Sequence, residues 1–192
     1  MKNKSFDSDI ENAVRVLKGG GTILYPTDTI WGIGCDATNA SAVEKVFAIK
    51  KRAEQKSLII LLDDVEKLYD YVEQIPEHAF TLIEYSRNPL TIIYPKAVNL
   101  AANIPAEDGS IAIRITKDEF CRELIRNSGK PLVSSSANVS GAPPPKNFSE
   151  ISDEIKNAVD YIVQYRQKEN KISKPSTIIR LGMKGEIEFI RK

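Results

Sequence analysis

The chain has 192 residues, a formal net charge of +1 and 42% hydrophobic residues. This length suits one domain spanning residues 1–192, with enough apolar residues for a sizeable core. The near-neutral charge excludes nucleic-acid binding through overall charge, so any such contact needs a local basic patch. Cys35 and Cys121 form neither a CxxC motif nor a zinc spacing, which favours a reducing, cytoplasmic compartment. The polar start is untypical of a signal peptide, and no run reaches the ~18 apolar residues of a membrane span.

Short apolar runs bounded by glycine, proline and polar clusters predict the strands. These strands are expected at 22–25, 58–62, 90–94, 111–115, 131–135, 161–165, 176–181 and 186–190. Helix starts are expected at Asp7 or Ser8, Asn39 or Ser41, Thr116 with Glu119, and Ser149 or Ser152, and the stretch 64–86 is helix-rich. The stretch 26–38 shows neither the helical nor the strand periodicity of apolar residues, and its glycines and proline predict an ordered loop. Strands alternate with helices in the first part of the chain and follow one another in the last part. This order favours an α/β fold with a mixed sheet flanked by helices.

Several common catalytic motifs are absent from the sequence. His78 is the only histidine and lies among acidic and polar residues, so neither a Ser-His-Asp triad nor a histidine metal site is indicated. No P-loop motif is present, and Gly32-Ile33-Gly34 lacks the third glycine of a dinucleotide site. The sequence therefore predicts no protein-bound metal, and it favours reactions that depend on positioning and charge.

A dense cationic run follows the second predicted helix, formed by Lys50, Lys51, Arg52 and Lys56. Cations at a helix C-terminus complement its dipole, so a solvated structural face is one interpretation. A clamp for a polyphosphate is the other, because arginine offers a planar fork and lysine a point charge to phosphate oxygens. The residues alone leave both open.

Polar side chains also accompany three of the predicted strands. Thr27, Asp28 and Thr29 follow the first strand and form either a local turn or a binding site for a small polar ligand. Alternation places Arg114 opposite the isoleucines of its strand, where it needs an anionic partner: a ligand carboxylate or a structural Asp or Glu. Ser134 and Ser136 share a face where another strand ends, a common position for ligands in α/β sheets.

Five segments taken together resemble the YrdC/TsaC family, the threonylcarbamoyl-adenylate synthases. In family order they are YPTDTIWGIGCDA (25–37), the K-x-R of Lys50 and Arg52 with Lys56, SIAIRI (110–115), SSSANVSGAP (134–143) and KPSTIIRL (174–181). The resemblance implies a twisted α/β sheet with a concave, basic groove, in the short form that lacks an extra C-terminal domain. It also implies synthesis of threonylcarbamoyl-AMP and pyrophosphate from L-threonine, bicarbonate or CO₂, and ATP with Mg²⁺, for the threonylcarbamoyladenosine modification of tRNA.

The resemblance carries site residues over by motif. Threonine would be bound by Thr29, Arg114, Ser136 and Ser176. ATP would be bound by Arg52, Lys56, Ser110, Asn138 and Arg191. The catalytic cations would be Lys50 and Arg52. Further implied partners are tRNA or double-stranded RNA on the basic groove and, downstream, the proteins of a threonylcarbamoyl-transferase complex.

The sequence departs from many relatives at a few positions. Ala53 and Ser57 replace prolines, Leu61 replaces a histidine found in some members, and Lys146 replaces a threonine. Two alternative functions stay open at this point. One is a paralogue of the same fold that binds RNA or nucleotide without synthase activity. The other is a domain related to a carbamoyl-transfer protein, although the zinc-finger and acylphosphatase-like segments of such proteins are not seen.

Overall fold

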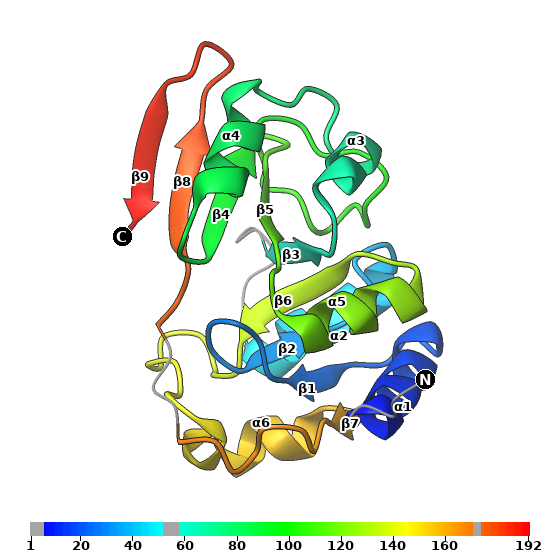
Figure 1. The fold of residues 1–192 in the computed structure, drawn as a ribbon. Helices are drawn as coiled ribbons and strands as arrows, with labels where there is room; N and C mark the ends of the chain where they lie inside the picture. Colours follow the sequence, from blue (N-terminus) through cyan, green and yellow to red (C-terminus); the bar gives the residue numbers. More distant parts are fainter. Residues whose placement is uncertain (1–5, 52–57, 171–173) are drawn as a thin grey trace.

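The computed structural model describes residues 6–51, 58–170 and 174–192 (Figure 1). The helices are α1 (Asp7–Lys18), α2 (Ala40–Lys50), η1 (Val65–Lys67), α3 (Leu68–Tyr71), α4 (His78–Tyr85), α5 (Glu119–Ser128), η2 (Phe148–Glu150) and α6 (Asp153–Ala158). The strands are β1 (Ile23–Tyr25), β2 (Gly32–Gly34), β3 (Ile59–Leu62), β4 (Leu90–Tyr94), β5 (Ile111–Ile115), β6 (Leu132–Ser136), β7 (Tyr161–Ile162), β8 (Thr177–Leu181) and β9 (Ile187–Arg191).

The described strands form a nine-stranded sheet in the order β7-β1-β2-β6-β3-β5-β4-β8-β9. Three neighbouring pairs are parallel, β1 with β7, β3 with β5 and β4 with β8, and the other pairs are antiparallel. In Figure 1, β1, β2 and β6 lie across the view while β4, β5, β8 and β9 lie roughly upright, which is the accumulated twist of a large sheet. The predicted twisted mixed α/β sheet is confirmed. The basic character of a groove stays a prediction.

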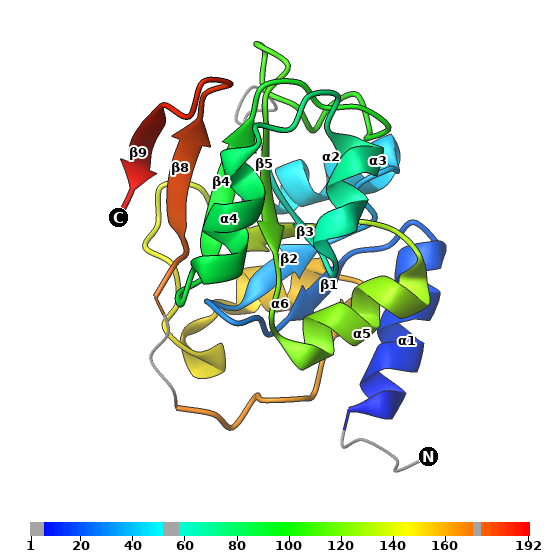
Figure 2. The ribbon, with the colours of Figure 1, turned by 45° about the horizontal axis from the view of Figure 1, so that its top comes forward.

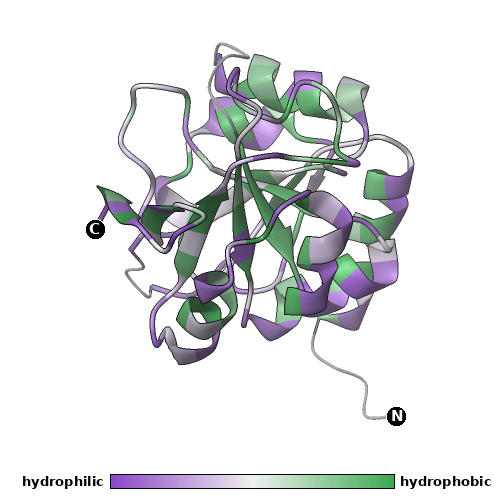
Figure 3. Ribbon diagram, turned by 90° about the horizontal axis from the view of Figure 1, so that it is seen from above, coloured by the Kyte–Doolittle hydropathy of each residue, from purple (hydrophilic) through white to green (hydrophobic). Residues whose placement is uncertain are grey.

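Two apolar clusters pack on opposite faces of the sheet. In β1, Ile23 and Tyr25 join α1 and α5 in one cluster, while Leu24 joins α2 and α6 in the other. The same alternation divides β3, where Leu61 faces α5 and its neighbours face the larger cluster. Figure 2 shows helices on both sides of the strands, and Figure 3 shows hydrophobic residues concentrated in the strands, with hydrophilic residues toward the outside of the helices. No helix of the described residues is long and apolar enough to cross a bilayer.

Helix starts were predicted correctly in two places and wrongly in two. Asn39 caps α2 and Ser152 caps α6, each accepting a bond from a first-turn amide. The capping box at Thr116 is wrong, because Asp118 is the N-cap residue of α5 and its carboxylate accepts from the backbone of Cys121. The predicted cap of α1 is also wrong: the N-cap position holds Phe6, whose ring packs in the core instead.

The predicted loop at 26–38 contains β2, which lies inside the sheet between β1 and β6, so that prediction is wrong. The sequence shows no signal for this strand because two of its three residues are glycines, so no hydrophobic alternation is visible. A Cβ at Gly34 would lie 2.7 Å from both the ring of Tyr25 and the carbonyl oxygen of Val133. The missing side chain lets the Tyr25 ring cross β2, and its hydroxyl donates to that carbonyl at 3.1 Å. Burial raises the pKa of Tyr25 well above its ordinary value, so the phenol stays protonated.

Candidate functional site

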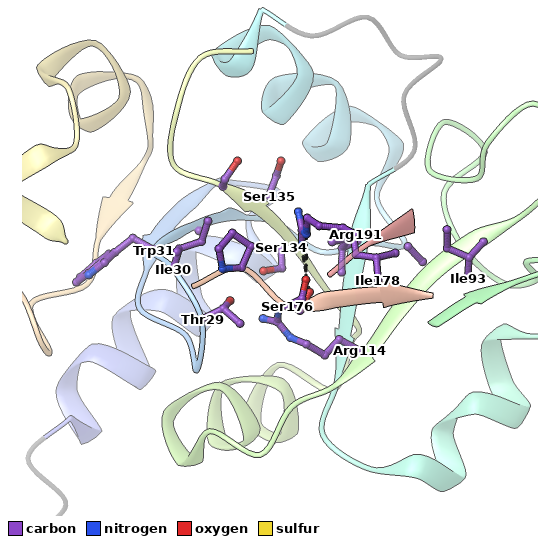
Figure 4. A pocket seen from close by; sticks show the side chains of 15 residues that line it. Thr29, Ile30, Trp31, Ile93, Arg114, Ser134, Ser135, Ser176, Ile178 and Arg191 are labelled. Carbon is purple, nitrogen blue, oxygen red and sulfur yellow. Dashed lines mark hydrogen bonds between the residues drawn. The ribbon is translucent and has the colours of Figure 1, made fainter. Parts of the chain in front are cut away.

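A cavity of about 250 Å³ opens where β6, β3, β5, β4 and β8 present one face, and the loop after β1 closes one side (Figure 4). Its wall is formed by Thr29, Ile30, Trp31, Gly32, Ile59, Ile93, Ala112, Arg114, Ser134, Ser135, Ser136, Pro175, Ser176, Ile178 and Arg191. All four residues expected to bind threonine are in this set, together with Arg191. The cavity is below the usual size range for drug-sized ligands, so it suits a molecule as small as an amino acid.

Arg114 is the buried cation of this cavity, with 3% of its surface exposed. It shares its face of β5 with Ala112, as alternation predicted. Its Nη2 lies 3.1 Å from Oδ1 of Asp28, which confirms a structural aspartate as its partner. The two atoms are close but not aligned as a hydrogen bond, and Nε and Nη2 of Arg114 have no hydrogen-bond partner among the described residues. Asp28 therefore balances the charge of Arg114, while the side chain of Arg114 still lines the cavity.

Thr29 lies in the loop after β1 and is 5% exposed. The hydroxyl of Thr27 donates to the carbonyl of Ile30 at 2.9 Å and accepts from the backbone amide of Thr29. Because the single hydroxyl hydrogen of Thr27 is used there, the 2.9 Å contact between the two hydroxyls is donated by Thr29. The oxygen of Thr29 can then accept a hydrogen bond from a ligand amine or hydroxyl, so the local turn and the binding site coexist.

Ser134 and Ser136 line the cavity from β6, two residues apart on one face, as predicted. Across the strands, Ser136 pairs with Gly32 of β2 and Ser134 with Ile59 of β3. Both are partly exposed. The described residues that line the cavity include no histidine or carboxylate that could act as a base, and His78 is on α4. The serines therefore suit binding better than nucleophilic attack.

Ser176 enters the cavity just before β8 and is 2% exposed. Its Oγ lies 2.8 Å from Oγ1 of Thr91 on β4, and Arg191 donates from Nη2 to the same oxygen at 3.2 Å. The Nε of Arg191 donates to the Ser176 carbonyl at 3.0 Å. Burial, followed by the positive charge of Arg114, lowers the pKa of Arg191. The two guanidinium groups thus lie on either side of Ser176, and their mutual repulsion favours an anion between them.

Lys50 is 2% exposed at the end of α2 and does not line the cavity. Its Nζ donates to the backbone carbonyls of Ser136 and Asn138, the second at 2.7 Å. The side-chain amide of Asn138 donates to the carbonyls of Val139 and Ala142. Lys50 and Asn138 thus fix the loop that leaves β6, and these contacts belong to the fold whatever the residues do with a nucleotide.

The other residues expected to bind ATP are dispersed. Ser110 is 5% exposed in the turn before β5, where its amide donates to the carboxylate of Asp108 at 2.9 Å. Hydrogen bonds from Ser110 lower the pKa of that carboxyl. Arg52 and Lys56 lie outside the described residues. Of the predicted nucleotide group, the cavity therefore contains Arg191 alone among the described residues.

The sequence did not identify two apolar residues of the cavity wall, Ile93 and Ile178. It also did not identify Thr91, which lies behind the wall and contacts Ser176. The β4–β8 register places Thr91 beside Ile178 and Ile93 beside Arg180. Alternation from Ser176 would have pointed to Ile178, but no signal in the sequence identifies the partner strand of Thr91.

The sequence of this chain is similar to those of known proteins. A sequence profile for the Sua5, YciO and YrdC proteins, described as telomere recombination, matches residues 15–192. The chain belongs to this family. A relative in Pseudoalteromonas translucida named threonylcarbamoyl-AMP synthase is 34% identical over 186 residues, which cover 95% of this chain and 98% of the relative. A protein of the same name in Idiomarina loihiensis is 34% identical over 146 residues, covering 74% and 78%.

Solved structures of the Sua5/YciO/YrdC family share the fold. P. abyssi Sua5 complexed with L-threonine has a TM-score of 0.82 and 27% identity, and the match covers 93% of this chain and 52% of the other. This chain thus spans about half the length of that Sua5 chain. E. coli YciO has a TM-score of 0.82 at 23% identity, covering 96% and 89%, and supports the fold alone.

Proposed function

We propose that this protein is a threonylcarbamoyl-AMP synthase, which makes threonylcarbamoyl-AMP and pyrophosphate from L-threonine, bicarbonate or CO₂, and ATP. The observation that carries the proposal is Arg114, a buried cation that lines a cavity of a size that suits an amino acid. The names of the relatives and the threonine complex of P. abyssi Sua5 support the same substrate. They favour the synthase over a paralogue that only binds RNA or nucleotide.

In the proposed binding mode, the threonine carboxylate faces Arg114 and Ser176, since both present donors. The oxygen of Thr29 accepts from the amino group or the side-chain hydroxyl of the substrate. Ser136 completes the wall on the β6 side. Carboxylates are bound best by paired, charge-assisted donors, so exchange of the carboxylate for an amide should abolish most of the affinity.

The chemistry needs no protein nucleophile. The neutral amine of threonine adds to CO₂, forming an N–C bond and releasing a proton, and the product is a carbamate. A carbamate oxygen then attacks the α-phosphorus of ATP, and the bond to the pyrophosphate leaving group breaks. The protein contributes by holding two anionic reactants together and stabilising the charge that develops at phosphorus.

The nucleotide half of the site belongs to the proposal as well. Arg52 and Lys56, with Ser110, Asn138 and Arg191, are proposed to bind ATP, and Mg²⁺ enters with ATP as part of the substrate. Lys50 and Arg52 are the proposed catalytic cations. A cytoplasmic location, contact with tRNA and a downstream transferase complex complete the proposed role.

The decisive experiment incubates the pure protein with ATP, Mg²⁺, bicarbonate and labelled L-threonine. Threonylcarbamoyl-AMP and pyrophosphate should appear in equal amounts, and omission of threonine should stop both. Arg52→Ala should reduce the rate strongly while the circular dichroism spectrum stays that of the wild type. Folded protein that forms no product, but binds RNA with a steep salt dependence, would identify a nucleic-acid-binding paralogue.

A further inference from the structure

Ser176 is held from two sides by residues of other strands. Its hydroxyl oxygen contacts Oγ1 of Thr91 at 2.8 Å and Nη2 of Arg191 at 3.2 Å. Figure 4 shows the Arg191 bond and places Ser176 between the two arginines of the cavity. Thr91 has no exposed surface and does not line the cavity, so any effect it has on a ligand passes through Ser176.

The direction of these bonds follows from the number of donors and acceptors. A guanidinium only donates, so the bond from Arg191 uses one lone pair of the Ser176 oxygen. The hydroxyl of Thr91 has Ser176 as its side-chain partner among the described residues. If Thr91 accepted from Ser176, its own hydrogen would be buried without an acceptor, which is costly. Thr91 therefore donates and uses the second lone pair.

We infer that Thr91 and Arg191 are positioning residues, which occupy both lone pairs of the Ser176 oxygen and leave its hydrogen for a ligand in the cavity. Ser176 is thereby a donor only, and the ligand group opposite it must be an acceptor. The positively charged side chain of Arg114 lines the same cavity, so the group that suits both this charge and the Ser176 hydrogen is a carboxylate. This inference deepens the proposed function and depends on it for the identity of the amino acid, L-threonine.

Arg191 acquires a distinct task in this arrangement. The family resemblance assigns it to ATP, whereas its two side-chain hydrogen bonds among the described residues both end on Ser176. Through Ser176, Arg191 acts on the amino-acid side of the site. Replacement of Arg191 should then weaken threonine binding even when no nucleotide is present.

The test measures threonine affinity by calorimetry with purified variants. Thr91→Val removes the hydroxyl, and threonine should bind about five- to tenfold more weakly, the effect of one lost hydrogen bond. Thr91→Ser keeps the hydroxyl and should restore wild-type affinity. The matched control is Thr22→Val, because Thr22 is also buried but bonds Asp160 away from the cavity. This control should bind threonine as the wild type does.

A double-mutant cycle separates orientation of Ser176 from a general packing defect. In a Ser176→Ala background, Thr91→Val should change threonine affinity by less than about twofold. The role of Thr91 would be overturned if Thr91→Val weakened threonine binding equally with Ser176 and with Ser176→Ala. It would also be overturned if the Thr91→Val single variant bound threonine with wild-type affinity. For Arg191→Gln, unchanged threonine affinity with a raised KM for ATP would overturn the role of Arg191.

The same experiment distinguishes failure of this inference from failure of the proposed function. Wild-type protein that binds threonine but forms no threonylcarbamoyl-AMP contradicts the synthase, and the calorimetric cycle still decides the role of Thr91. Wild-type protein without measurable threonine affinity contradicts both. In an active enzyme, Thr91→Val should raise the KM for threonine and leave the KM for ATP and kcat within about twofold, because the lost bond binds substrate and transition state alike.

Discussion

Arg114 and Lys50 are both buried cations, with 3% and 2% of their surfaces exposed, but their surroundings differ. Lys50 donates to the backbone carbonyl of Ser136 at the end of β6 and to that of Asn138 in the loop that follows. Arg114 has a nearby counter-charge in Asp28 and yet keeps donors without hydrogen-bond partners. A buried polar group normally finds partners within the fold, so each exception needs a reason. Lys50 therefore holds the fold together whatever it adds to catalysis, whereas Arg114 is placed for a ligand.

Two aspartates show the same contrast. Asp9 on α1 accepts from the hydroxyl of Tyr161 and from the amides of Gln164 and Tyr165. Its carboxylate joins α1 to the segment after β7. Asp28 instead presents an oxygen to Arg114 that makes no hydrogen bond among the described residues. Asp9 therefore acts as a structural anchor, and Asp28 as a counter-charge beside the cavity.

The largest effect is expected for Arg114. Arg114→Gln should lower kcat/KM for threonine by about 100-fold or more, because a charge-assisted partner of the carboxylate is lost. Arg114→Lys retains the charge but loses the planar fork, and it should still lose more than about tenfold. Arg87→Gln, in an exposed turn, is the control and should have wild-type kinetics. Near-normal activity in Arg114→Gln would remove Arg114 from the site.

Lys50 should behave in the opposite way, with an effect on stability in the absence of any substrate. Lys50→Met leaves the carbonyls of Ser136 and Asn138 without this donor, and we expect the free energy of unfolding to fall by about 2–3 kcal/mol. Urea denaturation measures this loss. The neighbouring Lys51, exposed and ion-paired with Glu154, provides the control Lys51→Met, expected to change stability by less than about 1 kcal/mol. Unchanged stability in Lys50→Met would contradict the contrast drawn with Arg114.

Asp28→Asn should have a smaller effect that depends on the ligand. Without threonine, the variant should lose about 1 kcal/mol of stability, because the buried guanidinium loses its counter-charge but keeps a polar neighbour. Saturating threonine should raise its Tm by more than it raises that of the wild type, since the substrate carboxylate then replaces the missing charge. Differential scanning fluorimetry measures both shifts. An equal or smaller threonine shift in the variant would show that Asp28 does not act as the counter-charge of Arg114.

The smallest effect concerns the anchor formed by Asp9. Burial, with the hydrogen bond to Asp9, raises the pKa of Tyr161 from 10.0 to about 12. The folded state therefore keeps a proton that the unfolded state loses, and stability falls as pH rises from about 10 to about 12. Tyr161→Phe should lose some stability at neutral pH and decline less steeply over this alkaline range. Identical slopes for the two proteins would exclude Tyr161 as the titrating group.

Local patterns in the sequence predicted most of the sheet, and the family resemblance supplied the four residues proposed to bind threonine, all of which line the cavity. Strand alternation placed Arg114 opposite the isoleucines of β5 and placed Ser134 with Ser136, and the structure confirms both faces. The family motifs identified Thr29 and Ser176, which line the other two sides of the cavity. The strand β2 was not predictable from hydrophobic alternation, because its glycines carry no side chain and serve to admit the ring of Tyr25.

The features that escaped prediction depend on pairings between distant segments. Asp28 could not be identified as the partner of Arg114 because the sequence does not show where the loop after β1 lies relative to β5. Thr91 reaches Ser176 only because β8 pairs with β4 in parallel. The cap predicted at Thr116 failed for a local reason instead. Thr116 accepts from the amide of Asp118, so two polar side chains two residues apart could each cap the helix, and the local pattern did not decide between them.

The pairing of β8 with β4 also governs when the cavity comes into existence during synthesis. Ser176 and Arg191 are made well after Thr91, and Ser176 contacts both of the other two residues. A nascent chain can form β1 to β6 while β8 is still in the ribosome, but the threonine cavity then lacks one wall. Contacts so distant in sequence form slowly. Substrate affinity is thus acquired only when β8 docks on β4, and bound threonine would favour this state over chains in which β8 and β9 are undocked.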